Sequence, residues 1–195
     1  MAQREYFMEH MDDYRKLLLT EPRGYPCQNA NVIVPPSSTH PQAAYGFIIL
    51  EQNKIYPAMS GHNCICVATT LLETGMVPMK EPVTNFQLEA PVGLVDIEAT
   101  CKDGKAVAIK LRNAPAFPGA LDVKVDVPEL GEVNVDIVFG GMWFAIVDAE
   151  SIGLRLDSSQ GKEICRFGEM IKIATREQHP VEHPLIDYPG IFLTH

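Results

Sequence analysis

The sequence has no long apolar run. None of its apolar stretches approaches the ~20 consecutive residues that a helix needs to cross a bilayer. The segment from Met1 to Tyr6 also lacks the apolar core of a secretory signal. We therefore expect no membrane anchor, no membrane as a partner and no export.

Basic residues are scarce compared with acidic ones. The 195 residues include 16 Lys and Arg against 25 Asp and Glu, which gives a formal net charge of −9. Nucleic acids and anionic membranes both select a basic face, so this balance excludes them as expected partners. It does not exclude an anionic small molecule, because a local site can be positive on an acidic protein.

Cysteine is rare, and its five occurrences are irregularly spaced. An odd number without a framework pattern is typical of free thiols in a reducing compartment, so we expect a cytoplasmic location. Cys64 and Cys66, without a histidine at ligand spacing, make a weak zinc signal, and we expect no metal. P-loop, dinucleotide-binding and Gly-x-Ser-x-Gly motifs are absent as well.

What the sequence does contain is a set of short alternating segments between two amphipathic helices. Apolar residues at helical spacing predict helices over 4–19 and 160–176. Asp103-Gly104 is a strong hairpin signal, and most segments are joined by short turns, which favours antiparallel pairing. The predicted strands cover 32–34, 44–50, 86–89, 92–99, 107–111, 123–127, 133–137 and 143–147, and a last one begins at 191.

The helix predicted over 64–72 has almost no polar stripe. A helix that is apolar all round must be enclosed on every side, and this one is too short to span a membrane. We therefore expect an α+β fold, in which a mostly antiparallel sheet wraps around one central buried helix, with peripheral helices outside.

The segment Met59-Ser60-Gly61-His62-Asn63 carries the chemical signal. It leads through a glycine turn into the apolar helix, whose first N–H groups have no internal partners and favour a carboxylate or phosphate. Ser60 would stand at the mouth of this cradle. By pattern alone, a capping role for Ser60 and a structural hydrogen-bonding role for His62 are the commoner outcomes. Cys64 lies one turn further on, and core packing is the favoured role for it.

These residues resemble the Met-Cys-Gly-His motif of the proline racemase family, which includes proline racemases, 4-hydroxyproline 2-epimerases and trans-3-hydroxy-L-proline dehydratases. The resemblance extends over nearly the whole chain. It includes the segments Leu19-Thr20-Glu21-Pro22-Arg23-Gly24, Leu72-Glu73-Thr74-Gly75-Met76-Val77, Ala90-Pro91-Val92-Gly93-Leu94-Val95, Val127-Pro128-Glu129-Leu130-Gly131 and Asp136-Ile137-Val138-Phe139-Gly140-Gly141.

The resemblance implies a fold like that of diaminopimelate epimerase, with two lobes that each wrap a sheet around a central helix. In this family, two residues at the two helix starts remove and return the α-proton of the substrate from opposite faces. The helix N-termini hold its carboxylate, without a metal or pyridoxal cofactor. Ser60 then corresponds to the first catalytic cysteine, and Gly61, His62 and Asn63 are the expected substrate-binding residues.

The sequence departs from the family pattern in three places. Ser60 replaces cysteine, and an unassisted serine is a poor base, although it could donate a proton, hold a water or orient the substrate. The Asp-Arg-Ser-Pro-Cys-Gly-Thr motif of the other lobe is absent, and Cys165 is not in such a context. The family's opening strand is also absent. We therefore expect residues 1–178 to be an N-terminal lobe without its first strand, and 179–195 a linker and the first strand of a missing lobe.

These features predict an enzyme of the racemase and epimerase class, or a hydroxyproline dehydratase, when the protein is full length. Its substrate would be a small imino acid, proline or hydroxyproline, and the fragment alone would be inactive. A racemase of plain proline and a non-catalytic imino-acid-binding homologue remain the alternatives. A homodimer is left open.

Overall fold

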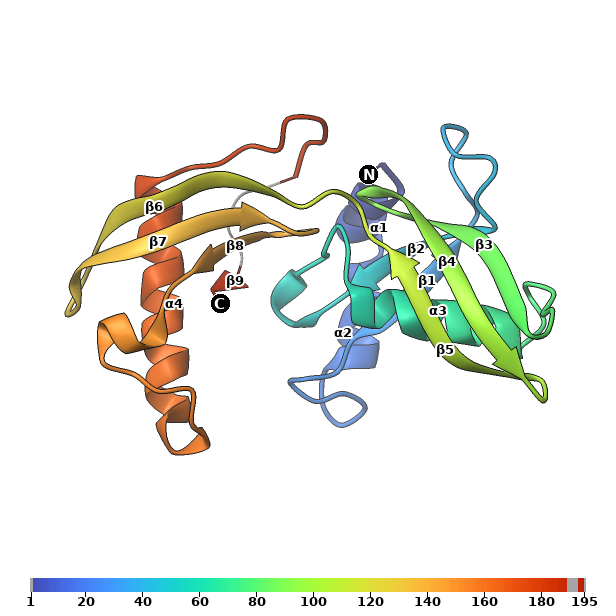
Figure 1. Cartoon of the computed structure of the whole chain (residues 1–195), viewed down its shortest axis with the longest axis horizontal. Coiled ribbons are helices and arrows are strands. Elements are labelled where there is room, and N and C mark those ends of the chain that lie inside the picture. Colours follow the sequence, from blue (N-terminus) through green and yellow to red (C-terminus); the bar gives the residue numbers. More distant parts are fainter. Residues whose placement is uncertain (1, 189–192, 195) are drawn as a thin grey trace. The chain divides into compact units, whose positions relative to one another are not determined.

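The structure is a computed structural model that describes residues 2–188 and 193–194. The chain divides into two compact units, Met1–Ala114 and Pro115–His195, and each has its own sheet (Figure 1). The fold is α+β, as predicted, but it has two sheets with a helix against each. The expected single sheet around a single helix up to residue 178 is not what the described residues form.

The first unit contains a five-stranded sheet in the order β1-β2-β3-β4-β5. Neighbouring strands are antiparallel except β2 and β3, which are parallel. At the β4–β5 turn, Asp103 and Gly104 have φ angles of 52° and 72°, the two positive values that a tight hairpin needs. The strands are β1 Ala30–Val34, β2 Tyr45–Leu50, β3 Val83–Ala90, β4 Gly93–Lys102 and β5 Lys105–Arg112.

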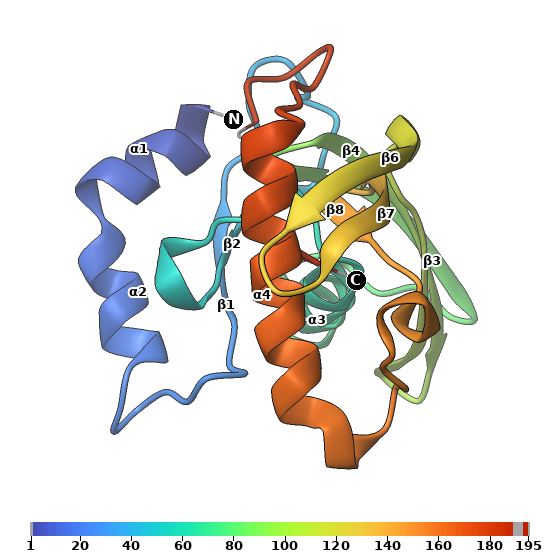
Figure 2. The same ribbon diagram turned by 90° about the vertical axis from the view of Figure 1, so that its left-hand side faces the viewer.

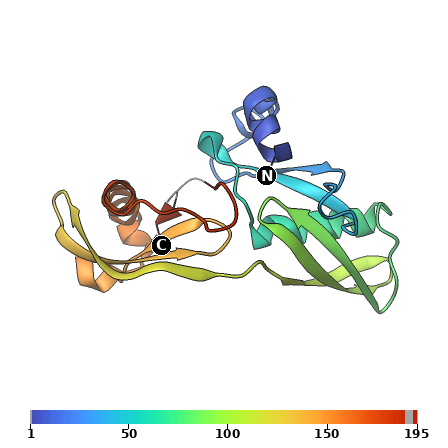
Figure 3. The same cartoon turned by 90° about the horizontal axis from the view of Figure 1, so that it is seen from above.

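Strand β2 is apolar on both faces because both faces are covered. Phe47 and Ile49 join the core that contains helix α3, Gly61–Glu73. Ile48 and Leu50 point the other way and pack with side chains of the two N-terminal helices. A continuous apolar run, rather than alternation, is the expected pattern for a strand in this position. Figure 3 shows the N-terminal helices and α3 on opposite sides of β1 and β2.

The helix predicted over 4–19 is two helices, α1 Ala2–His10 and α2 Asp12–Leu19, and a short 3₁₀ helix, η1 Gln52–Lys54, follows β2. The break arises where the Asp12 carboxylate accepts hydrogen bonds from Arg15 Nε at 2.6 Å and from the Tyr56 hydroxyl at 2.6 Å. An acidic side chain also suits the first turn of a helix. The prediction of one helix is therefore wrong.

The contribution of Asp12 to the stability of the first unit depends on pH and is largest at neutral pH. Hydrogen bonds from Arg15, with a smaller contribution from Tyr56, lower the pKa of its carboxyl to about 2 against the opposing effect of burial. The pKa in an unfolded chain is ~3.9. The stabilisation is therefore complete above about pH 5 and is lost as the pH falls towards 2.

We expect Asp12→Asn to lower the free energy of unfolding by about 2 kcal/mol at pH 7. The difference from wild type should shrink by pH 3, because Asp12 is then becoming protonated in the unfolded wild-type chain. Urea unfolding at both pH values measures this. The control is Asp13→Asn, since the neighbouring Asp13 side chain is 94% exposed and should contribute under about 0.5 kcal/mol. Equal losses in the two variants would contradict the assignment.

Helix α3 packs against the sheet on one side only. Cys64, Ala68 and Leu71 are fully buried, and β5 and β1, the two edges of the sheet, both contact the helix. Ile65, however, is 41% exposed, and Cys66 beside it is exposed as well. The prediction of a helix enclosed on every side is wrong for the described residues, because the five strands reach only part of the way around it.

The second unit pairs a four-stranded sheet with one long helix. The strand order is β6-β7-β8-β9, antiparallel except for the parallel pair β8 and β9. Figure 2 shows α4 running across this sheet. Ile191 and Phe192, in the predicted last strand, lie outside the described residues. Leu193, in the same predicted strand, pairs with Phe144 of β8. The elements are β6 Phe117–Val127, β7 Gly131–Phe139, β8 Trp143–Ile146, η2 Ala149–Ile152, η3 Ser158–Gln160, α4 Gly161–Gln178 and β9 Leu193–Thr194.

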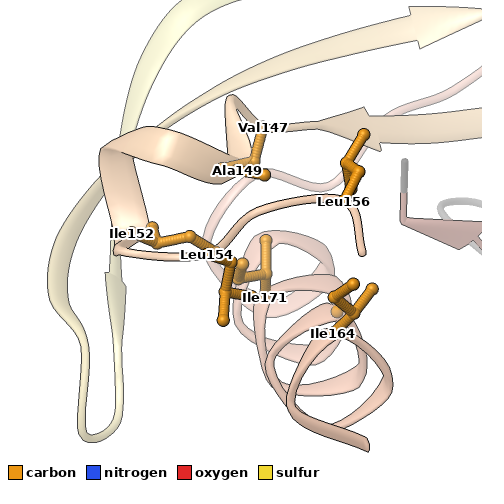
Figure 4. A pocket seen from close by; sticks show the side chains of 8 residues that line it. Val147, Ala149, Ile152, Leu154, Leu156, Ile164 and Ile171 are labelled. Carbon is orange, nitrogen blue, oxygen red and sulfur yellow. The ribbon is translucent and has the colours of Figure 1, made fainter. Parts of the chain in front are cut away.

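An apolar pocket of about 400 Å³ lies between the 147–156 segment and α4 (Figure 4). Its lining carries no polar or titratable side chain that could orient a substrate, so it does not have the composition of an active site. The lining residues are Val147, Ala149, Ile152, Leu154, Leu156, Ile164, Gly168 and Ile171. No helix among residues 2–188 and 193–194 is long and apolar enough to cross a membrane.

Candidate functional site

The predicted helix start at Ser60 is confirmed. Ser60 has extended backbone angles, φ −146° and ψ 122°, and helix α3 begins at Gly61. Ala58 and Met59 are buried ahead of it, so the chain is held in the core up to the residue that caps the helix. Ser60 itself is half-buried, which leaves it accessible from the helix end.

Two backbone amides at this helix start have no hydrogen-bond partner among the described residues. The Asn63 N–H donates to Ser60 Oγ over 3.4 Å, and the Cys64 N–H makes the first helical bond, 2.9 Å to the Ser60 carbonyl. The N–H groups of Gly61 and His62 donate to nothing within the described part of the chain. A Cβ added at Gly61 would meet no atom within 4 Å. The geometry therefore offers two open donors where the helix dipole favours an anion.

Behind Ser60 lies a chain of two asparagines. Asn63 Nδ2 donates to Ser60 Oγ over 3.0 Å, and Asn63 Oδ1 accepts from Asn31 Nδ2 over 2.9 Å. Asn63 is only 2% exposed. Its side chain therefore holds Ser60 from the interior, and only its backbone lies at the helix start. Asn31 was missed by sequence reasoning, since no motif marks a residue on β1 that is 32 positions away.

The His62 side chain is exposed and lies along the surface of its own helix, towards Cys66. Its Nε2 lies 4.0 Å from Cys66 Sγ, one helical turn further on. This spacing follows from the i, i+4 geometry of a helix. In the described part of the chain, it is the backbone N–H of His62, rather than its ring, that is open at the helix start.

The cysteine nearest to Ser60 in the core is not suited to act as a base. Cys64 is fully buried, and burial raises the pKa of its thiol to about 12. A thiol with such a pKa is almost entirely protonated at neutral pH, whereas thiolate is the reactive form. The core-packing role predicted for Cys64 is the one that the structure shows.

Thiol labelling should separate the five cysteines into two classes. We expect three to react quickly with an aromatic disulfide reagent in the native protein, because Cys27, Cys66 and Cys165 are exposed, and two to react only after unfolding, because Cys64 and Cys101 are buried. Mass spectrometry of the labelled peptides gives the assignment. Fast labelling of Cys64 would contradict the packing of α3.

The described residues contain no group of three or more His, Cys, Asp or Glu side chains arranged to hold a metal ion. The two histidines of the 179–188 segment serve structural contacts in the second unit. His179 Nε2 lies 3.1 Å from the Lys124 carbonyl oxygen, and the His183 ring packs 4.4 Å from the Phe139 ring.

A family model, a curated relative and two solved structures all place the chain near the same family. The sequence model of the family described as Proline racemase matches residues 1–191. The chain is 43% identical over 182 residues to a 4-hydroxyproline 2-epimerase from Streptosporangium roseum, covering 93% of this chain and 54% of that protein. It therefore spans about half the length of this relative.

Two solved structures are similar over 98% of the chain and 56% of their own length. One is a probable proline racemase from Agrobacterium radiobacter K84 with bound carbonate, with a TM-score of 0.90 and 37% identity. The other is a hydroxyproline epimerase from Agrobacterium vitis with bound trans-4-hydroxy-L-proline, with a TM-score of 0.89 and 33% identity.

Proposed function

The chain belongs to the proline racemase family, and from this premise we propose that it is the N-terminal part of a cofactor-independent 4-hydroxyproline 2-epimerase. The observation that carries the proposal is the helix start at Ser60. Two free amides, at Gly61 and His62, adjoin a half-buried hydroxyl there, in a chain that is 43% identical to an epimerase of this substrate.

In the proposed reaction, the substrate carboxylate accepts hydrogen bonds from the Gly61 and His62 amides. Loss of the α-proton to a base breaks the Cα–H bond and moves its electron pair into the carboxylate, which then carries the developing charge. Fixed N–H donors and a helix dipole stabilise that charge without reorganising. A proton returned to the opposite face of Cα completes the inversion.

Ser60 serves one face of the α-carbon in this proposal, and a residue outside this chain serves the other. A hydroxyl is a weak base, so Ser60 is assigned to returning the proton in the forward reaction. By microscopic reversibility the same oxygen removes it in the reverse reaction. The chain spans about half the relative's length, 54%, which supports a site completed by another part of the protein.

We assign Met1–Ala114 to one lobe and Pro115–His195 to a second lobe of a diaminopimelate epimerase-like fold, in place of the lobe boundary expected at residue 178. The division of the chain into two compact units at this point supports it. The Asp-Arg-Ser-Pro-Cys-Gly-Thr motif of the family's other helix start does not occur in the chain, so the 195-residue chain would present one helix start of a two-helix site and be inactive alone.

Incubation of a protein with the full length of its relatives tests the function. The candidate substrates are trans-4-hydroxy-L-proline, L-proline and trans-3-hydroxy-L-proline, and chiral chromatography follows the products. Inversion of 4-hydroxyproline as the dominant reaction supports the proposal. Dominant racemisation of proline, or dehydration of 3-hydroxyproline, would overturn the substrate assignment. Binding without any turnover would favour a non-catalytic protein, and turnover by the 195-residue chain would contradict the divided site.

A further inference from the structure

We propose that Asn63, held by Asn31, is a positioning residue that turns the Ser60 hydroxyl hydrogen out of the helix and towards the substrate. This inference rests on the proposed function and deepens it, because it assigns the state in which Ser60 meets the α-carbon. It concerns two side chains that do not touch the substrate themselves.

The geometry around Ser60 Oγ carries the argument. The oxygen accepts the Asn63 backbone N–H at 3.4 Å and the Asn63 side-chain Nδ2 at 3.0 Å. A serine hydroxyl has two acceptor lone pairs and one hydrogen to donate. With both acceptor positions facing N–H donors, the hydroxyl hydrogen cannot point at either of them. Its remaining direction is away from Asn63, so Ser60 presents a proton donor at the helix start.

Asn31 pairs with the oxygen end of the Asn63 amide. Asn63 Oδ1 accepts from Asn31 Nδ2 at 2.9 Å, so the oxygen is engaged and the nitrogen is left for Ser60. If the amide were reversed, its oxygen would accept the Ser60 hydroxyl and turn the hydrogen inward. Asn63 is 2% exposed, and a buried amide is costly unless its polar atoms are paired. In this orientation the pair satisfies Asn63 Oδ1, while Asn31 Oδ1 is buried with no hydrogen-bond partner among the described residues.

The arrangement would also ease the proton transfer itself. As the Ser60 O–H bond breaks and the Cα–H bond forms, the electron pair left on Oγ makes an alkoxide. A proton from water restores the hydroxyl, and the hydroxide left by that water takes the proton held by the base on the other face. Two N–H donors already aimed at Oγ stabilise that negative charge, and hydrogen bonds to charged groups are the stronger ones. The same contacts then assist the reverse step, in which Oγ accepts the proton.

Asn63→Asp in the full-length protein tests the inference, since its carboxyl has the shape of the amide. When protonated it can donate to Ser60 Oγ as asparagine does, and when ionised it can only accept. We expect the variant's kcat for 4-hydroxyproline inversion to fall about tenfold or more as the pH rises through this new ionisation. Wild type should show no such step. A merely structural role would lower stability without adding an ionisation to the kcat profile.

Asn31→Ala provides a second measurement in case Asn63→Asp does not fold. We expect kcat to fall about tenfold while KM changes less than about twofold, because the free amides of Gly61 and His62 are untouched. Thr70→Ala is the matched control, since the exposed Thr70 hydroxyl bonds its own helix through the Cys66 carbonyl. If the wild type is active and both asparagine variants keep its kcat and its pH profile, this inference is overturned while the proposed function stands. An inactive wild type would instead overturn the proposed function on which it rests.

Discussion

Replacing Ser60 with alanine in the full-length protein is expected to lower kcat for inversion of 4-hydroxyproline by about 10²–10⁴-fold, the usual contribution of a positioned acid or base. KM should change little, because the amides at Gly61 and His62 do not depend on the hydroxyl. Incorporation of solvent deuterium at Cα, followed by proton NMR, measures the rate directly. Activity within a factor of about two of wild type would contradict the assignment of Ser60.

Ser60→Cys is the informative companion variant. A thiolate forms readily at a helix N-terminus, so cysteine should support proton transfer where alanine does not. The variant should also become sensitive to alkylating reagents, and substrate should protect it. An inactive cysteine variant that binds substrate normally would show that the site depends on a hydroxyl in particular.

Replacing Leu71 with alanine is expected to lower the free energy of unfolding by about 2–5 kcal/mol. Leu71 is fully buried in the core shared by α3 and the first sheet, so truncation removes apolar contacts and leaves a cavity. Thermal or urea unfolding of the 195-residue chain, monitored with a probe within the first unit, measures the effect.

Ile65→Ala is the matched control on the same helix. Ile65 is 41% exposed, so its truncation should cost less than about 1 kcal/mol. The contrast between the two positions tests which face of α3 the sheet covers. Comparable losses at both positions in the isolated chain would show that α3 is enclosed, as the sequence pattern predicts and the structure does not.

Local sequence patterns predicted most elements because their causes are local. The alternation of β4 and the paired turn at Asp103-Gly104 specify a hairpin without help from distant residues. The break between α1 and α2 could not be predicted, since Asp12 owes its position partly to Tyr56, 44 residues away. The parallel pairing of β2 and β3 has no signal in either strand.

The candidate site was predictable where a motif lies in one short segment. Ser60 and Gly61 stand at the start of α3 as the sequence predicts. The inward turn of the Asn63 side chain and its pairing with Asn31 depend on how β1 lies against the helix, which no spacing reveals. The exposed face of α3 was missed for a related reason: an apolar helix shows that cover is needed, but not which strands supply it.

The central claim is that an anionic head group docks on the free amides at the start of α3. Titrating ¹⁵N-labelled protein with trans-4-hydroxy-L-proline, and in parallel with pyrrolidine, which has the ring without the carboxylate, tests it at the level of single amides. We predict saturable shifts of the Gly61 and His62 amide resonances with hydroxyproline and none with pyrrolidine. Unmoved resonances at these two residues, with saturable shifts elsewhere in the protein, would contradict it.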